Sequence, residues 1–185
     1  LEIFNAVKAS EIAAPVEETF DRPLVETAPA AGTIVKEKLN KKLGTTEWTL
    51  SNGIQVVIKP TEFKKDQITM SIESEGGLSK VALEDLPSAA MATSIVAYNG
   101  IGEFSYLDLQ KALTGKNVSL SPSIDEYEEG MSGASTVKDF ETMMQLAYLY
   151  FTAPRQDDQA FQSLMSMLET QLAARDKNPK TAFQD

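Results

Sequence analysis

The side chains in this sequence that could take part in chemistry are carboxylates and hydroxyls, because its 185 residues include no histidine and no cysteine. Histidine is the commonest metal ligand and the usual general base near neutral pH. The lack of thiols excludes disulfides, thiolate nucleophiles and zinc fingers. A metal site would need carboxylates alone, which suit calcium or magnesium better than zinc. We therefore predict no catalytic residue and no metal ligand in this chain.

An acidic group occurs at Asp125, Glu126, Glu128 and Glu129. It could bind a cation or a basic peptide segment. Calcium loops, however, need glycine-assisted curvature and a fixed order of ligands, which this segment does not show. A solvated hairpin tip explains the group better.

Two other patterns also have structural explanations. Alternate residues Ser119, Ser121 and Ser123 indicate a polar sheet face, because no base accompanies them to activate a nucleophile. Methionines recur at helical spacing and could form an adaptable peptide-binding surface, although core packing is the commoner role. These methionines are Met143, Met144, Met165 and Met167. The residues that would bind a substrate are unknown from the sequence.

Charge and hydropathy narrow the classes of partner. The net charge is -10, so phosphate backbones and anionic membrane surfaces would be repelled on average. No apolar run approaches the roughly 20 residues of a membrane-spanning helix. We predict no nucleic-acid partner and no membrane span. The start at Leu1 without a signal peptide suggests a piece of a longer gene product.

The segment from Leu1 to Gly44 differs from the rest because it is rich in proline and small residues. A short helix from Ser10 to Phe20 would be interrupted at Pro15. We interpret residues 1–44 as an inter-half linker or docking arm. A disordered remnant is the alternative.

From Thr45 the pattern becomes period two. Trp48 and Leu50 precede Asn52-Gly53, and alternating apolar residues follow it, which is the strongest short-range signal for a β-hairpin. The other predicted strands are Gln67–Ser74, Val118–Ile124 and Glu128–Ser132. Four helices are also predicted: Glu84–Tyr98, a helix capped by Ser105, a helix capped by Thr136 and ended by Pro154, and a long helix capped by Asp157. This order predicts an α+β fold, with helices packed on one face of a mainly antiparallel sheet.

The hairpin from Trp48 to Pro60 resembles the opening strands of domains in the pitrilysin/insulinase family of zinc peptidases. Family domains continue with a strand that ends in Gly-Gly, here Ile68 to Gly77, and then a small-residue helix. That helix ends in Ala97-Tyr98-Asn99-Gly100, similar to the phrase after the family's zinc helix. The segment Asp139–Pro179 resembles the following helix pair. The resemblance covers Thr45 to Asp185, and implies the first part of a domain like that of mitochondrial processing peptidase, here incomplete.

Active domains of the family carry an inverted His-x-x-Glu-His motif on the zinc helix. Alignment on Ala97–Gly100 puts this motif on Met91-Ala92-Thr93-Ser94-Ile95. The third family ligand is a glutamate near Glu169, although an ordinary solvated helix residue explains Glu169 better. One carboxylate without partners holds zinc poorly. The resemblance thus implies an inactive domain of the bacterial long-chain type.

The resemblance implies a non-catalytic half of a bacterial zinc metalloendopeptidase that helps to enclose or bind peptide substrate. Its partners would be the zinc-bearing catalytic half of the same polypeptide and the peptide, and the isolated fragment could dimerise. Similar bacterial proteins occur in the periplasm or cell envelope. Two alternatives stay open: a structural scaffold or protein-interaction domain derived from a peptidase, and a metal-independent hydrolase that uses a carboxylate pair.

Overall fold

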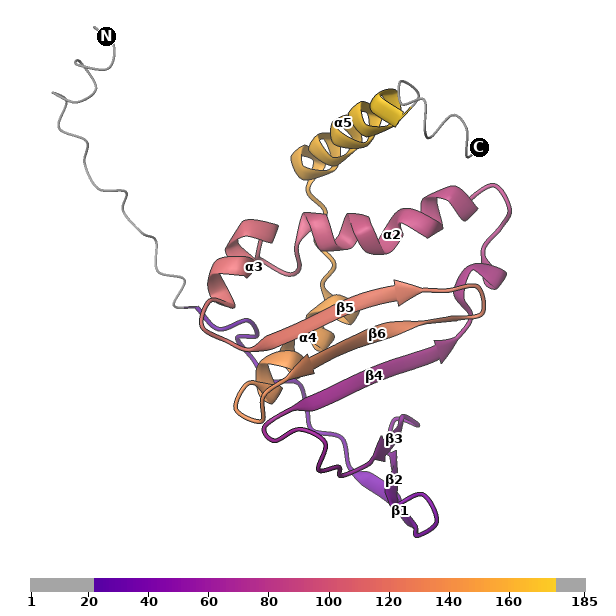
Figure 1. The fold of residues 1–185 in the computed structure, drawn as a ribbon, viewed down its shortest axis with the longest axis vertical. Helices are drawn as coiled ribbons and strands as arrows, with labels where there is room; N and C mark the ends of the chain where they lie inside the picture. The colour runs from indigo at the N-terminus through magenta and orange to yellow at the C-terminus, as the bar shows by residue number, and fades with distance from the viewer. Residues whose placement is uncertain (1–21, 176–185) are drawn as a thin grey trace, which may run out of the picture.

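The structure is a computed structural model and describes residues 22–175. Two antiparallel three-stranded sheets form in this part of the chain, and helices accompany the second sheet (Figure 1). The first sheet contains β1 (Ile34–Asn40), β2 (Thr45–Leu50) and β3 (Gln55–Ile58), and the second contains β4 (Ile68–Glu75), β6 (Glu128–Ser135) and β5 (Val118–Ile124) in that order. The helical elements are the 3₁₀ turn η1 (Gly77–Lys80), α2 (Leu86–Asn99), α3 (Tyr106–Ala112), α4 (Phe140–Thr152) and α5 (Asp158–Arg175).

The second sheet has one apolar and one polar face, because its residues alternate. The cross-strand register places Ile72 next to Met131 and Met70 next to Gly133, which in turn faces Leu120. These apolar side chains pack with the buried residues of α4, including Met143 and Leu146, in one core. The α+β fold with helices packed on an antiparallel sheet is confirmed.

Local signals in the sequence set the ends of several elements. Gly53 adopts a φ of 89°, and its N–H donates to the Leu50 carbonyl at 2.9 Å, so the Asn-Gly turn forms as predicted. The Ser105 hydroxyl accepts the Asp108 N–H at 3.2 Å at the start of α3. The Asp157 carboxylate accepts the Ala160 N–H at 3.0 Å at the start of α5. These caps satisfy N–H groups that a helix leaves without partners.

The strand β1 lies inside residues 1–44, the segment interpreted as an inter-half linker or docking arm, and it pairs with β2. Its side chains are almost all exposed, and charge alternates along Lys36, Glu37 and Lys38, so no apolar pattern marks it. Cross-strand contacts with β2 stabilise it instead. The Lys38 Nζ lies 3.0 Å from a Glu47 carboxylate oxygen, and the Trp48 indole N–H donates to Glu37 at 2.7 Å. The predicted helix Ser10–Phe20 lies outside the described residues.

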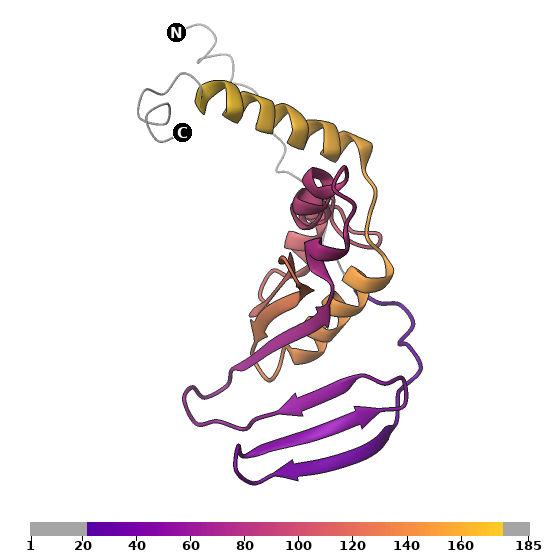
Figure 2. The ribbon, with the colours of Figure 1, turned by 90° about the vertical axis from the view of Figure 1, so that its right-hand side faces the viewer.

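The helices α4 and α5 bury fewer of their apolar side chains than the periodicity of the sequence suggests. On α4, Met143 is fully buried, but Met144 and Phe151 are 44% and 62% exposed. On α5, Leu164 is buried while Leu172 is 58% exposed. Figure 2 shows why: α4 lies against the second sheet, whereas α5 extends above α2. No helix among residues 22–175 is long and apolar enough to cross a membrane.

Candidate functional site

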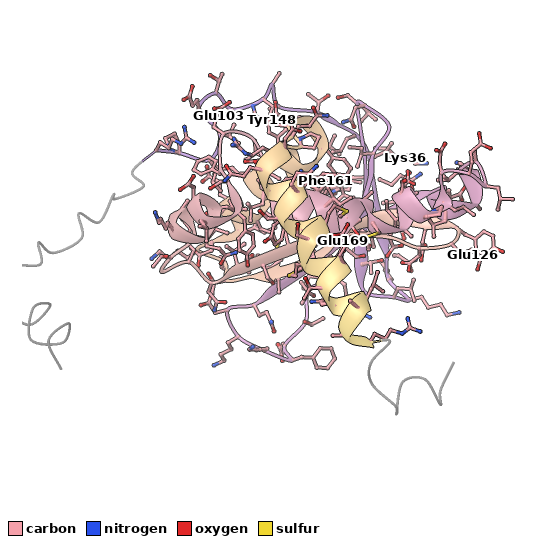
Figure 3. All side chains as sticks on the ribbon, turned by 90° about the horizontal axis from the view of Figure 1, so that it is seen from above. Lys36, Glu103, Glu126, Tyr148, Phe161 and Glu169 are labelled. Carbon is pink, nitrogen blue, oxygen red and sulfur yellow. The ribbon has the colours of Figure 1, made fainter. Side chains whose placement is uncertain are left out.

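The positions aligned with the zinc motif lie on α2, against which α5 packs. Met91 and Ile95 are half-buried, and Ser94 is exposed. Glu169 is exposed on α5 where that helix crosses α2 (Figure 3). The thioether of Met91, the hydroxyl of Ser94 and the alkyl side chain of Ile95 are not among the nitrogen, thiolate and carboxylate ligands that zinc takes in proteins, and Glu169 supplies a single carboxylate. The residues here therefore do not fit a zinc ion. Residues 22–175 contain no group of three histidine, cysteine or acidic side chains placed to hold a metal.

A pocket of about 450 Å³ lies where α3 faces β5, with α4 beneath. Apolar and polar residues both line it, and the surface that it exposes is more polar than apolar. The lining residues are Leu109, Gln110, Leu113, Thr114, Lys116, Val118, Ser119, Leu120, Ser121, Leu146 and Tyr150.

The strand β5 borders this pocket and is an outer strand of its sheet. Asp125 N–H donates to the Glu128 carbonyl, and Thr136 N–H donates to the Asn117 carbonyl, so odd-numbered residues of this strand bond to β6. The backbone N–H and C=O groups of Val118 and Leu120 therefore point away from β6. Pro122 occupies an outward position, where it lacks an N–H to offer. Backbone pairing with another segment is thus favoured at Val118–Leu120, beside the pocket.

A carboxylate holds the loop that leads into β5. Asp139 is buried before α4 and accepts the Asn117 N–H at 2.9 Å and the Thr136 hydroxyl at 2.8 Å. These hydrogen bonds, the Asn117 one foremost, hold the pKa of Asp139 below its usual 3.8. Beside it, the Lys116 ammonium donates to the Thr142 hydroxyl at 3.2 Å. Burial raises the pKa of Tyr150 at the pocket wall above 10.0, so that phenol is neutral at physiological pH.

The acidic group lies elsewhere, at the tip of the β5–β6 hairpin. Asp125, Glu126 and Glu128 are exposed there, and Figure 3 shows Glu126 far from α5. Glu129 is also exposed, and its carboxylate accepts the Gly77 N–H at 3.0 Å. This arrangement agrees with the predicted solvated tip and gives the group a structural role at the Gly76-Gly77 turn.

The structure separates the other sequence candidates. Ser119, Ser121 and Ser123 are exposed and alternate with apolar Leu120, as predicted for a polar sheet face, and the first two also line the pocket. Met143 is fully buried, Met165 is half-buried, and Met144 and Met167 are more than 40% exposed. The methionines therefore do not form one surface. The pocket itself was missed by sequence reasoning, because its lining comes from three elements that only the tertiary fold brings together.

No protein-family model matches the chain. The chain is 31% identical over 183 residues to the Arabidopsis thaliana protein named "Zinc protease PQQL-like", which is 97% of this chain and 16% of that protein. Its fold is similar to that of the periplasmic protease PqqL from Escherichia coli (TM-score 0.77, 21% identity, 99% of this chain and 20% of that chain). It is also similar to a mutant of the ferredoxin protease FusC in complex with Arabidopsis ferredoxin (TM-score 0.75, 20% identity, 99% of this chain and 20% of that chain). The chain therefore spans less than a quarter of each of these proteins.

Proposed function

Because the chain belongs to the pitrilysin/insulinase family of zinc peptidases, we propose that it is a non-catalytic part of a larger zinc metallopeptidase. In this role it helps to enclose or bind peptide substrate, while a catalytic half of the same polypeptide supplies the zinc site. The observation that carries the proposal is the likeness to zinc proteases along nearly the whole chain, in a sequence with no histidine and no cysteine.

The donor chemistry supports a role without catalysis. The pitrilysin/insulinase reaction needs a metal that polarises a carbonyl and activates water. The aligned positions Met91 and Ile95 offer no nitrogen or thiolate, and Glu169 alone provides one carboxylate. The metal-independent alternative would need two carboxylates with separated pKa values in one cleft, and Asp139, the buried carboxylate, is held by loop hydrogen bonds.

The pocket beside β5 supports peptide binding. An extended peptide placed along Val118 and Leu120 could bond to their outward N–H and C=O groups. An apolar side chain of that peptide would then enter the pocket between Leu109, Leu113 and Leu146. The net charge of -10 would favour peptides that also carry lysine or arginine.

The test compares metal, cleavage and binding in the 185-residue chain. The purified chain is mixed with equimolar zinc, passed through a desalting column and analysed for retained metal. Cleavage and binding of a fluorescein-labelled peptide of alternating leucine and threonine, flanked by lysines, are then measured. We expect no retained zinc, no cleavage and saturable binding. Stoichiometric zinc together with cleavage would refute the non-catalytic role.

A second measurement separates peptide binding from a scaffold role. In the longer polypeptide that carries the chain, peptide turnover is compared before and after blocking the pocket with Ser121→Trp. A peptide-binding role predicts a higher KM with little change in kcat, because the substitution removes ground-state contacts. Unchanged KM and kcat, in a protein of unchanged stability, would favour the structural scaffold instead.

A further inference from the structure

The segment 22–33 is attached to the folded chain at both of its ends. At the far end, Ser51 N–H donates to the Thr33 carbonyl at 2.8 Å, and the Thr33 N–H donates to the Ser51 hydroxyl at 3.2 Å. At the near end, Leu24 and Val25 pack against the buried core. Figure 2 shows this segment running from the α4 side of the second sheet down to β1. We call residues 22–33 the strap.

One side chain fastens the near end of the strap. The Arg22 guanidinium carbon lies 4.4 Å from the centre of the Phe104 ring, and its Nη2 donates to the Glu103 carbonyl at 2.7 Å. A guanidinium plane over an aromatic face is an attractive contact, and the charged hydrogen bond adds to it. The ring it covers is only 2% exposed. Arg22 thus joins parts of the chain that are 81 residues apart.

The covered ring belongs to the turn that starts α3. Phe104 and Ile101 exchange backbone hydrogen bonds of 2.9 and 3.0 Å, and Ser105 then caps α3. Both residues share the core with Leu109, which is a wall of the α3–β5 pocket. A displacement of the Phe104 ring would therefore loosen the first turn of α3 and that wall.

We propose that Arg22 and Phe104 form a clasp that couples the strap to α3. The strap then moves with the folded part of the chain, and the clasp stabilises the first turn of α3. Loss of the clasp would loosen the α3 wall of the pocket. This inference concerns the mechanics of the chain and does not depend on the proposed function.

Hydrogen–deuterium exchange of the 185-residue chain tests the clasp, because it reports local opening segment by segment. Arg22→Ala removes both contacts and should raise exchange about tenfold or more in residues 106–113, whose N–H groups are hydrogen-bonded in and after α3, which corresponds to about 1.4 kcal/mol. Arg22→Lys keeps the charge but not the planar fork, so we expect a smaller rise in the same segment. Lys64→Ala removes an exposed cation from the β3–β4 loop and is the matched control, with exchange equal to wild type.

Two results would overturn the proposal. Wild-type exchange in residues 106–113 of Arg22→Ala would show that the clasp is not coupled to α3. An equal rise in β2, which belongs to the other sheet, would show a general loss of stability rather than a local one.

Discussion

Blocking the pocket beside β5 is the sharpest test of peptide binding, because the strand offers a matched pair of sites. Ser121 and Ser123 are both exposed on the same face of β5, and only Ser121 lines the pocket. Ser121→Trp places an indole at the pocket mouth. Ser123→Trp adds the same indole side chain two residues further along the strand. Both positions are exposed, so neither change should alter stability by more than about 0.5 kcal/mol.

The size of the effect follows from what the pocket can bury. A volume of about 450 Å³ accommodates one large apolar side chain of a peptide. Full burial of such a side chain is worth about 1.5–3 kcal/mol. Its loss should weaken peptide binding by about 10- to 150-fold in Ser121→Trp. Ser123→Trp should leave the affinity within about threefold of wild type, because an exposed substitution away from the site changes free energy by a few tenths of a kcal/mol.

Fluorescence anisotropy with the labelled leucine–threonine peptide measures these affinities, and circular dichroism melting checks that both variants are folded. A peptide in which alanine replaces leucine serves as a second probe. It should bind weakly to wild type and to both variants alike. The reasoning is refuted if the two tryptophan variants bind the leucine peptide equally, or if Ser121→Trp binds it as tightly as wild type.

Three further experiments, with five substitutions, test the fold around this site. Leu146→Ala opens into the existing pocket and should cost about 2–3 kcal/mol, whereas Met143→Ala leaves a closed cavity and should cost about 4–5 kcal/mol in urea unfolding. The pKa of Asp139 is lower in the folded chain than its usual 3.8, so this carboxylate stabilises the fold above about pH 4, and the stabilisation is lost as pH falls through the folded-state pKa. Asp139→Asn should therefore flatten the acid limb of a curve of unfolding free energy against pH. An unchanged acid limb would contradict this. Gly100→Ala should lower the melting temperature of the protein far more than Gly115→Ala. Both glycines have positive φ, but only at position 100 would the added methyl group collide with backbone atoms. Equal losses of melting temperature would argue against that collision.

Most elements could be predicted from the sequence because their signals are local. The Asn52-Gly53 turn, the Ser105 and Asp157 caps and the double glycine after β4 are read within a few residues of where they act. The strand β1 was missed because it is charged and exposed, and its pairing depends on partners in β2. The burial of the apolar stripes on α4 and α5 was overestimated, since periodicity predicts which residues share a face but not how much of that face another element covers.

The sequence by itself determined which chemistry is open to these residues: without imidazole or thiolate, the positions aligned with the zinc motif have no suitable donors. Composition is enough for that conclusion, because ligand chemistry belongs to the side chains themselves. Only the tertiary structure decided where the pocket forms and where the strap is fastened. The pocket needs α3, β5 and α4 together, and Arg22 meets Glu103 across 81 residues of chain. Such contacts arise from packing between distant segments, which no local pattern of residues records.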